Sequence, residues 1–236
     1  MISRTIQKIN SQGLNHYQET KRKFKQAVQS ILKEHNSYEI DEAALPAYAH
    51  KNPLIDFIFW QRVKTAYDYA AKIGAKKILD FGCGTGLLSY ALATHDRNIL
   101  AVDIQFNPLK LIKQKIDFPN NIHFVEANLL QYDVAEKNFD LIVALDVLEH
   151  IKNLDEYILE FKKLLKPGGV ILISGPTENF LYKIGRKLAG EKFTGDYHVS
   201  NIHRIKQQFS KQMKTKTIKR LIWPVTLFEI FVAFND

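Results

Sequence analysis

The chain has 236 residues, of which 46% are hydrophobic and 25% are charged, with one cysteine and a formal net charge of +8. These values argue against a mainly disordered chain, and a lone cysteine excludes an internal disulfide or a cysteine-rich zinc site. We therefore expect a globular protein in a reducing, cytoplasmic setting. The positive charge favours anionic partners, such as nucleic acid, anionic lipid or acidic metabolites, without choosing among them.

The first third of the chain has helical patterns. Residues 14–35 are basic, and residues 41–74 are rich in aromatic side chains and end at Gly74, as a helix does at its C-terminus. No apolar run in the chain approaches the ~20 residues that a membrane-spanning helix needs. We expect residues 1–75 to form a helical segment or lid, and residues 76–236 to form one domain with a substrate-side insertion at about 177–213.

From residue 76 onward, short apolar runs alternate with longer amphipathic stretches, which predicts an α/β fold. Strands without polar alternation, separated by helices, indicate a doubly wound parallel sheet that is covered on both faces. The expected strands are residues 77–81, 98–104, 122–127, 139–145 and 169–175, and the expected helices are 86–95, 107–117, 129–137 and 153–166. Two further runs, 216–223 and 226–234, are joined too tightly at Pro224 to be parallel.

A glycine-rich loop, "DFGCGTG", follows the first predicted strand. Its three glycines, Gly82, Gly84 and Gly86, allow a ligand to approach the main chain closely. Asp103 ends the second predicted strand, 23 residues after Asp80, where an acid can accept hydrogen bonds from both hydroxyls of a ribose. The spacing therefore predicts a nucleoside site.

Two kinds of cofactor compete for this loop. A dinucleotide fingerprint requires a third glycine where this chain has Leu87, and it seldom places an acid directly before the loop, where a pyrophosphate would lie. Asp80 suits a ligand that carries a cation, such as an amino group. A nicotinamide-dependent oxidoreductase stays open as the less favoured alternative.

Four motifs together resemble a known family. "ILDFGCGTG" (78–86), "AVDI" (101–104), "VALDVLEHI" (143–151) and "LLKPGGVILIS" (164–174) are similar to the class I S-adenosylmethionine-dependent methyltransferases, especially the small-molecule branch that includes quinone-biosynthesis enzymes. The resemblance implies a Rossmann-like sheet of seven strands with a reversed C-terminal strand, and S-adenosyl-L-methionine as the cofactor.

The resemblance also implies a set of cofactor-binding residues. The glycine loop would lie along the methionine part, Asp80 would orient its ammonium group through the loop, and Asp103 would hold the ribose. Ile104 would flank adenine, the amide oxygen of Asn128 would accept a hydrogen bond from the adenine amino group, and the end of the fourth strand would line the wall near the sulfonium. The full set is Asp80, Phe81, Gly82, Cys83, Gly84, Gly86, Asp103, Ile104, Asn128, Leu129, Leu145 and Asp146.

Two histidines are candidates for a catalytic base. Methyl transfer to a hydroxyl requires that its proton be removed, and histidine suits this near neutral pH. His198 in "GDYHVSNIH" is the first candidate and His150 in "DVLEHI" the second, although both could serve only local hydrogen bonding, packing or capping. We expect no metal site, because the adjacent side chains of Glu149 and His150 diverge.

The acceptor is expected to be a small molecule or a lipid-like amphiphile. The Asn/Asp-Pro-Pro-aromatic motif that is typical of nucleobase methylation is absent after the fourth strand, so nucleic acid is disfavoured. Aromatic residues in 48–69 and basic residues in 177–193 could form a lid for an amphiphile, and peripheral membrane contact is a weaker expectation. A non-catalytic module that kept only the cofactor site is the other alternative.

Overall fold

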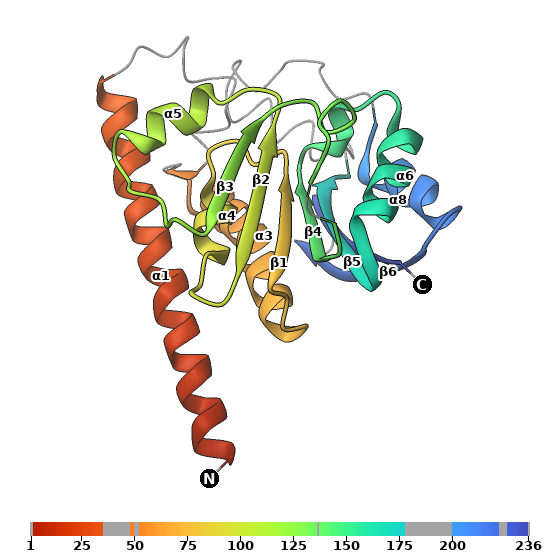
Figure 1. The fold of residues 1–236 in the computed structure, drawn as a ribbon. Coiled ribbons are helices and arrows are strands. Elements are labelled where there is room, and N and C mark those ends of the chain that lie inside the picture. The colour runs from red at the N-terminus through yellow and green to blue at the C-terminus, as the bar shows by residue number, and fades with distance from the viewer. Residues whose placement is uncertain are drawn as a thin grey trace.

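The computed structural model of the chain describes residues 2–34, 48–49, 52–135, 137–177, 200–221 and 226–235. Within these ranges the strands form one sheet between two groups of helices (Figure 1). The layers are helix, sheet and helix, which is the arrangement expected for a doubly wound α/β protein.

The sheet is mostly parallel, with one strand reversed. The strand order is β3-β2-β1-β4-β5-β7-β6. Strands β1 to β5 pair in parallel, whereas β7 is antiparallel to both β5 and β6. The predicted seven-stranded sheet with an antiparallel C-terminal strand is confirmed. The strands are β1 (Lys77–Phe81), β2 (Asn98–Asp103), β3 (Ile122–Glu126), β4 (Phe139–Leu145), β5 (Leu165–Pro176), β6 (Lys214–Leu221) and β7 (Phe228–Phe234).

The central strands are apolar on both faces because both faces are covered. Successive side chains point to opposite sides of a strand, so Ile78 packs in the core on one face of the sheet and Leu79 packs in the core on the other. Ile171 and Leu172 of β5 divide between the two cores in the same way. This arrangement explains the runs without polar alternation, and it leaves the carboxyl ends of the strands as the place where polar side chains gather.

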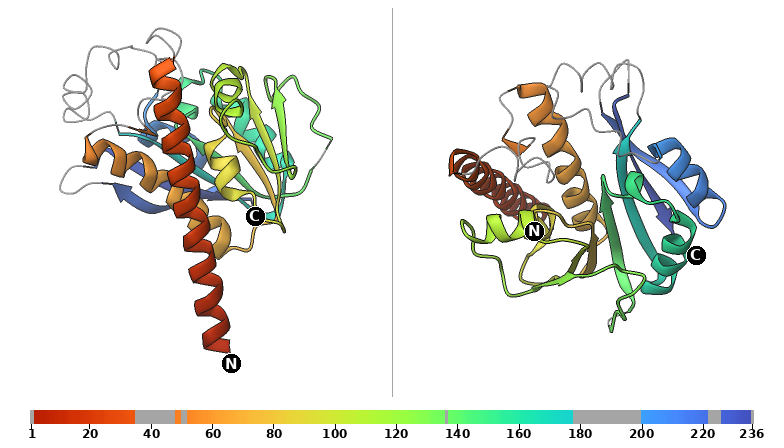
Figure 2. Two further views of the ribbon diagram at one scale, coloured as in Figure 1. Left: turned by 90° about the vertical axis from the view of Figure 1, so that its left-hand side faces the viewer. Right: turned by 90° about the horizontal axis from the view of Figure 1, so that it is seen from above.

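Helices cover each face in a separate group, which is clear when the molecule is seen from above (Figure 2). On one face lie α1 (Ile2–Glu34), α3 (Pro53–Lys72), α4 (Leu87–Leu92) and α5 (Asn107–Lys113). On the other lie the short 3-10 helix η3 (Leu148–His150), α6 (Leu154–Leu164) and α8 (Ile202–Ser210). The N-terminal part of α1 extends past the sheet (Figure 1). None of the described helices combines the length and apolar character needed to cross a bilayer.

Local signals in the sequence explain where α3 begins and ends. Asn52 caps the helix by accepting a hydrogen bond from the Leu54 N–H at 2.9 Å, and Pro53 occupies the first turn. The helix ends at Lys72, and Gly74 follows with a left-handed φ of 64°. The helix predicted over 41–74 is therefore confirmed from residue 53 onward, and residues 41–47 of that prediction lie outside the described residues.

Two of the predicted elements differ from the structure. The helix predicted over 129–137 is wrong: among its described residues the chain makes turns and bends. Strand β5 also begins earlier than predicted, at Leu165, directly after α6 ends at Leu164. Most of the substrate-side insertion expected at about 177–213 lies outside the described residues, and α8 is the helix within it that the structure describes.

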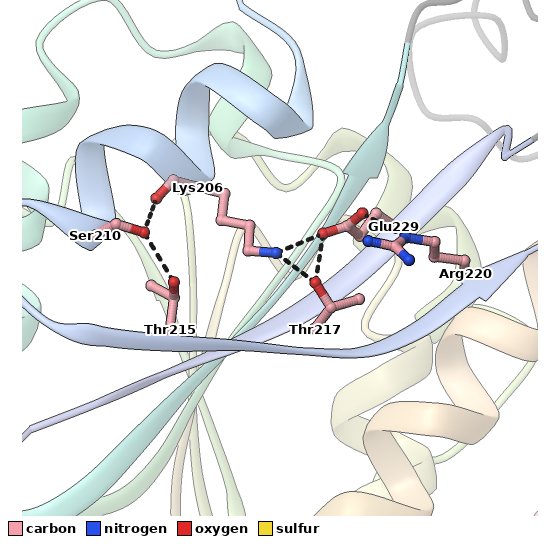
Figure 3. A network of polar contacts seen from close by, with 6 residues as sticks. All are labelled: Lys206, Ser210, Thr215, Thr217, Arg220 and Glu229. Carbon is pink, nitrogen blue, oxygen red and sulfur yellow. Dashed lines mark hydrogen bonds and ion pairs between the residues drawn. The ribbon is translucent and has the colours of Figure 1, made fainter.

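A polar network ties the reversed strand to its neighbours (Figure 3). Glu229 of β7 is buried and accepts hydrogen bonds from Thr217 of β6 at 2.7 Å and from Lys206 of α8 at 2.9 Å. Arg220 of β6 donates to the other carboxylate oxygen at 3.1 Å. Burial alone would raise the pKa of Glu229, but these donors lower it below its ordinary value. The network fixes the C-terminal hairpin against the helix layer.

Candidate functional site

The glycine loop connects β1 to α4 at the carboxyl end of the sheet. Gly82, Gly84 and Gly86 all have left-handed φ values, of 72°, 52° and 74°. The Gly82 N–H donates to the Val102 carbonyl of β2 at 2.8 Å, which fixes the start of the loop. A Cβ at Gly82 would lie 2.5 Å from a methyl group of Val147, whereas one at Gly84 would meet nothing within 4 Å. The loop is therefore closely packed at Gly82 and open at Gly84.

The two predicted acids lie on either side of this loop. Asp103, at the end of β2, accepts a hydrogen bond from the Gly84 N–H at 2.8 Å. Asp80, in β1, is 2% exposed and accepts a hydrogen bond from the Ser89 hydroxyl of α4 at 2.6 Å. Burial, together with the nearby charge of Asp103, raises the pKa of Asp80 to about 7. The structure thus brings the loop, Asp80 and Asp103 together, and it buries Asp80 too deeply for direct contact with a ligand. Their role in binding a cofactor stays a prediction.

Arg62 of α3 is a charged residue at this end of the sheet that the sequence analysis missed. It is 3% exposed and forms an ion pair with Asp146. Its guanidinium carbon lies 4.0 Å from the ring centroid of Phe59 and 4.6 Å from that of Phe228. Its Nε–H is buried and has no acceptor among the described residues. Its signal in the sequence is that it is the single arginine within the aromatic run 48–69.

Asp146 follows β4 in a strained conformation. Its φ of 54° lies in the left-handed region, which costs a non-glycine residue about 1–2 kcal/mol. Ser174 of β5 holds it in place, since its hydroxyl donates to the Asp146 carboxylate at 2.9 Å and its carbonyl accepts from the Asp146 N–H at 3.1 Å. Strain of this kind persists where the surroundings fix it and is concentrated at functional sites. Val147, the next residue, is the one that packs against Gly82.

The remaining predicted cofactor residues differ in what they offer a ligand. Ile104, directly after β2, is 74% exposed, which is unusual for a large apolar side chain and suits a flat partner. Asn128 already accepts hydrogen bonds at Oδ1 from the Tyr157 hydroxyl at 3.1 Å and the Leu130 N–H at 3.0 Å. The side chains of Phe81, Cys83 and Leu129 are buried in the cores, and Leu145 is partly buried at the end of β4. The buried side chains shape the site, and the main chain of these residues is the part that a ligand could contact.

The candidate bases are placed only in part. His150 is exposed on η3, four residues after Asp146. His198 lies outside the described residues, so its role stays a prediction. Among the described residues, no group of three or more histidine, cysteine, aspartate or glutamate side chains is arranged to hold a metal ion.

Comparisons with known proteins agree with the sequence motifs. Residues 79–173 match the family model described as a methyltransferase domain. The chain is 31% identical over 122 residues to a ubiquinone biosynthesis O-methyltransferase of Dechloromonas aromatica, a match that covers 48% of this chain and 49% of that protein. The Rickettsia typhi protein of the same name is 29% identical over 123 residues, with 51% and 47% covered. The chain spans about half the length of these relatives.

Solved structures share the fold at lower identity. The N-methyltransferase NodS of Bradyrhizobium japonicum, in complex with S-adenosyl-L-homocysteine, superposes with a TM-score of 0.60 at 18% identity, over 94% of this chain and 98% of that one. The magnesium protoporphyrin IX methyltransferase of Synechocystis gives a TM-score of 0.55 at 20% identity, over 75% and 82%. Residues 79–173 are therefore similar to a methyltransferase domain, and the chain shares its fold with solved methyltransferases.

Proposed function

We propose that the chain is an S-adenosylmethionine-dependent methyltransferase that acts on a small molecule. The observation that carries this proposal is the group formed by the open loop at Gly84, Asp103 hydrogen-bonded to it and buried Asp80 behind it. Asp103 offers an acceptor for ribose hydroxyls, and Asp80 offers a negative charge for an amino group. The methionyl nucleoside cofactor carries both matching groups.

Each part of the cofactor has a residue that suits it. Asp103 would accept hydrogen bonds from the ribose hydroxyls, and exposed Ile104 would lie against adenine. Arg62, which pairs with Asp146 at the same end of the sheet, would supply a positive charge that favours the methionine carboxylate. Asp80 would face the ammonium group through the loop, since a nearby cation favours its ionised form.

When bound, the cofactor supplies a methyl group on a sulfonium that is already a good leaving group. The task of this chain is then to align the acceptor with that methyl group and to exclude water. His150 and His198 stay the candidates for accepting the acceptor's proton. Replacing the base, in His150→Ala or His198→Ala, should lower turnover without changing cofactor affinity. A titration with S-adenosyl-L-homocysteine measures that affinity and distinguishes loss of the base from loss of cofactor binding.

The finer proposal is an amphiphilic, lipid-like acceptor. Leu54 and Phe57 are each 52% exposed in the first turns of α3, the helix that carries Arg62. Exposed apolar side chains beside a site suit an apolar ligand. The matched relatives are named for ubiquinone biosynthesis, which supports the same class. Peripheral membrane contact belongs to this proposal, and it is abandoned if neither vesicles of anionic lipid nor amphiphilic acids bind at low salt.

The experiment that tests the proposed activity is a transfer assay with methyl-labelled cofactor. The chain is incubated with labelled S-adenosyl-L-methionine and separate soluble and membrane extracts, and the labelled product is identified. We expect one small molecule or lipid to acquire the label, and Asp103→Ala to abolish transfer, because it loses hydrogen bonds to a charged group that are worth about 1.5–3 kcal/mol each. If the chain binds the cofactor and labels nothing, the non-catalytic module replaces this proposal.

A further inference from the structure

We propose that a groove between the end of η3 and the outer face of α8 is a binding site for a phosphate group, carried by a small molecule or by a lipid head group. The groove has a volume of about 360 Å³. None of the residues that line it belongs to the glycine loop or to the predicted cofactor set. The site is therefore separate from the one on which the proposed function rests.

One face of α8 forms the first wall of the groove. Arg204, Gln208 and Lys211 follow one another at spacings of four and three residues, so they lie along the same side of the helix and its C-terminal end. The opposite side of α8 is fixed in the core, where Ile205 and Phe209 are fully buried. The polar wall thus stands on a helix that the core holds in place.

The second wall is the connection from η3 to α6, where Ile151 and Lys152 line the groove. Ser200 also lines it, and its N–H donates to the Glu149 carbonyl of η3 at 3.2 Å. Helices α6 and α8 lie beside each other on this face of the sheet (Figure 1). The backbone hydrogen bond at Ser200 therefore ties the two walls together.

The groove is positively charged. Lys152, Arg204 and Lys211 bring three cations to it, and no acidic side chain lines it. Within the part of the chain that the structure describes, none of these three side chains forms an ion pair. Three like charges therefore face one space without a counter-charge from the described protein.

Other lysines of the same two helices do have acidic partners. Lys163 of α6 pairs with Glu160 at 3.0 Å, and Lys206 of α8 pairs with Glu229 at 2.9 Å. The groove thus differs from its surroundings in lacking acids, and an anionic ligand would supply the missing charge.

The donors of the groove suit a phosphate better than a carboxylate. A phosphate group on a ligand carries about two negative charges and three acceptor oxygens, whereas a carboxylate carries one charge and two oxygens. Arg204 can donate two parallel hydrogen bonds to phosphate oxygens, and the amides of Gln207 and Gln208 add neutral donors. The volume lies in the range of small-molecule sites, which leaves room beside Ile151 for the organic part of the ligand.

The test compares two ligands that share a ring and differ in their anionic group. Phenyl phosphate and benzoate are titrated into the full chain at one ionic strength. We expect the native chain to bind phenyl phosphate more tightly. Arg204→Gln should weaken its binding at least about fivefold and Lys211→Gln at least about threefold, because each removes a charge-assisted hydrogen bond. Both side chains are exposed, so these variants keep the fold.

A matched control lies on β6. Lys216→Gln makes the same change as Lys211→Gln at an exposed position outside the groove, and it should leave the affinity for phenyl phosphate unchanged. If Lys216→Gln weakens binding as much as Lys211→Gln, the effect comes from the overall charge and the inference is overturned. Failure to prefer phenyl phosphate over benzoate overturns it as well, unless the vesicles described next bind through the groove.

Vesicles distinguish the two sources of the phosphate group. The chain is sedimented with vesicles of phosphatidylcholine, with and without phosphatidic acid. Binding to phosphatidic acid that is lost in Arg204→Gln and Lys211→Gln assigns the groove to a lipid head group. If vesicle binding is absent or independent of these residues, binding of phenyl phosphate assigns it to a small phosphorylated molecule, and failure to bind either probe overturns the inference.

The proposed function is judged by a separate titration. S-adenosyl-L-homocysteine should bind the native chain, Arg204→Gln and Lys211→Gln with the same affinity, because the groove shares no residue with the cofactor loop. Its failure to bind the native chain would contradict the proposed function, and the phosphate titration would still decide the inference about the groove.

Discussion

At the scale of single residues, the position of Asp80 has two opposite effects on its ionisation. Burial disfavours the ionised carboxylate, whereas a cation on the ligand would favour it. Asp80 is buried between β1 and α4, where an ionised carboxylate is costly, and it stands behind the loop that the cofactor would occupy. The resulting pKa of about 7 means that a cation on the ligand can shift its ionisation in the physiological range. A buried acid of this kind lowers the stability of the folded chain, and its charge would stabilise the bound ligand.

The stability of the chain should therefore depend on pH through Asp80. The folded pKa of about 7 exceeds the ordinary value of 3.8, so the native state binds a proton more tightly than the unfolded state. The contribution of Asp80 is fully favourable below about pH 4 and is lost as the pH rises to about 7. Asp80→Asn removes this loss, so the variant should gain stability relative to the native chain between pH 4 and 8, by at most about 4 kcal/mol.

Urea unfolding at fixed pH values across this range measures the difference. A constant difference between the native chain and Asp80→Asn over the whole range would contradict the account. Binding of S-adenosyl-L-homocysteine by the variant, followed in parallel, shows whether the charge serves the ligand.

The site residues differ in whether their neighbours in the sequence are enough to identify them. Asp80, the loop glycines and Asp103 could be predicted because each occupies a fixed place relative to a strand end. Arg62 could not, because its importance depends on Asp146 and Phe228, which are distant in sequence and become neighbours only in the folded sheet. Ser174 could not be predicted for the same reason, because a serine within an apolar strand does not indicate which distant residue it will bind.

At the scale of elements, the C-terminal hairpin depends on the network around Glu229 (Figure 3). The carboxylate is almost fully buried, while Lys206 and Arg220 are partly exposed. Its donors come from α8 and β6, so the network joins three elements. Because β7 also carries Phe228, this hairpin links fold stability to the candidate site.

Glu229→Gln should lower the free energy of unfolding by about 1–3 kcal/mol, because two cations lose a buried counter-charge. The folded pKa of Glu229 is depressed, so its contribution is present above the ordinary value of 4.5 and is lost as the pH falls through the folded value. The difference between native chain and variant should therefore shrink from pH 6 to pH 3, as measured by urea unfolding.

The matched control is Glu160→Gln, which removes an ion pair with the largely exposed Lys163 on α6. Exposed pairs contribute at most about 1 kcal/mol, so this variant should stay close to the native chain. Equal losses from the two variants would show that burial of Glu229 is not what matters.

The predicted strand bounds were most accurate where a short, mostly apolar run lay between turn signals. The β1 and β4 bounds match the predicted runs 77–81 and 139–145, because short, mostly apolar runs of this length between turn signals favour buried strands. The helix predicted over 129–137 starts without continuing: the Asn128 side chain accepts from the Leu130 N–H, as a helix-capping residue does, and its carbonyl accepts from the Gln131 and Tyr132 N–H groups. The described residues after this single turn have no helical structure.

At the scale of the whole molecule, the N-terminal helices share one core with the sheet. Phe24 of α1 is 1% exposed and lies edge to face with Tyr90 of α4 and with Phe118. Phe118 in turn packs where a Cβ on Gly86 would lie, at 2.9 Å. Helix α1 thus packs behind the glycine loop through Phe118, although the division of the chain at residue 75 stays a prediction.

Phe24→Ala should lower the free energy of unfolding by about 3–5 kcal/mol, the cost of a cavity left by a buried phenylalanine. It should also weaken binding of S-adenosyl-L-homocysteine, since the loop loses its support. Leu32→Ala, at an exposed position on the same helix, is the control and should cost less than about 1 kcal/mol. If Phe24→Ala unfolds like the native chain in urea, α1 is not part of the core.

The central claim is that the open loop at Gly84 binds the methionyl nucleoside cofactor. The most direct measurement is a calorimetric titration of the chain with S-adenosyl-L-homocysteine and with NADH, repeated for Gly84→Ala and Gly74→Ala. Both glycines have a left-handed φ and open space around them, so the two variants carry similar backbone strain. We predict binding of S-adenosyl-L-homocysteine and not of NADH, lost in Gly84→Ala and kept in Gly74→Ala. Binding of NADH alone, or equal affinity for S-adenosyl-L-homocysteine in both variants, would contradict the account.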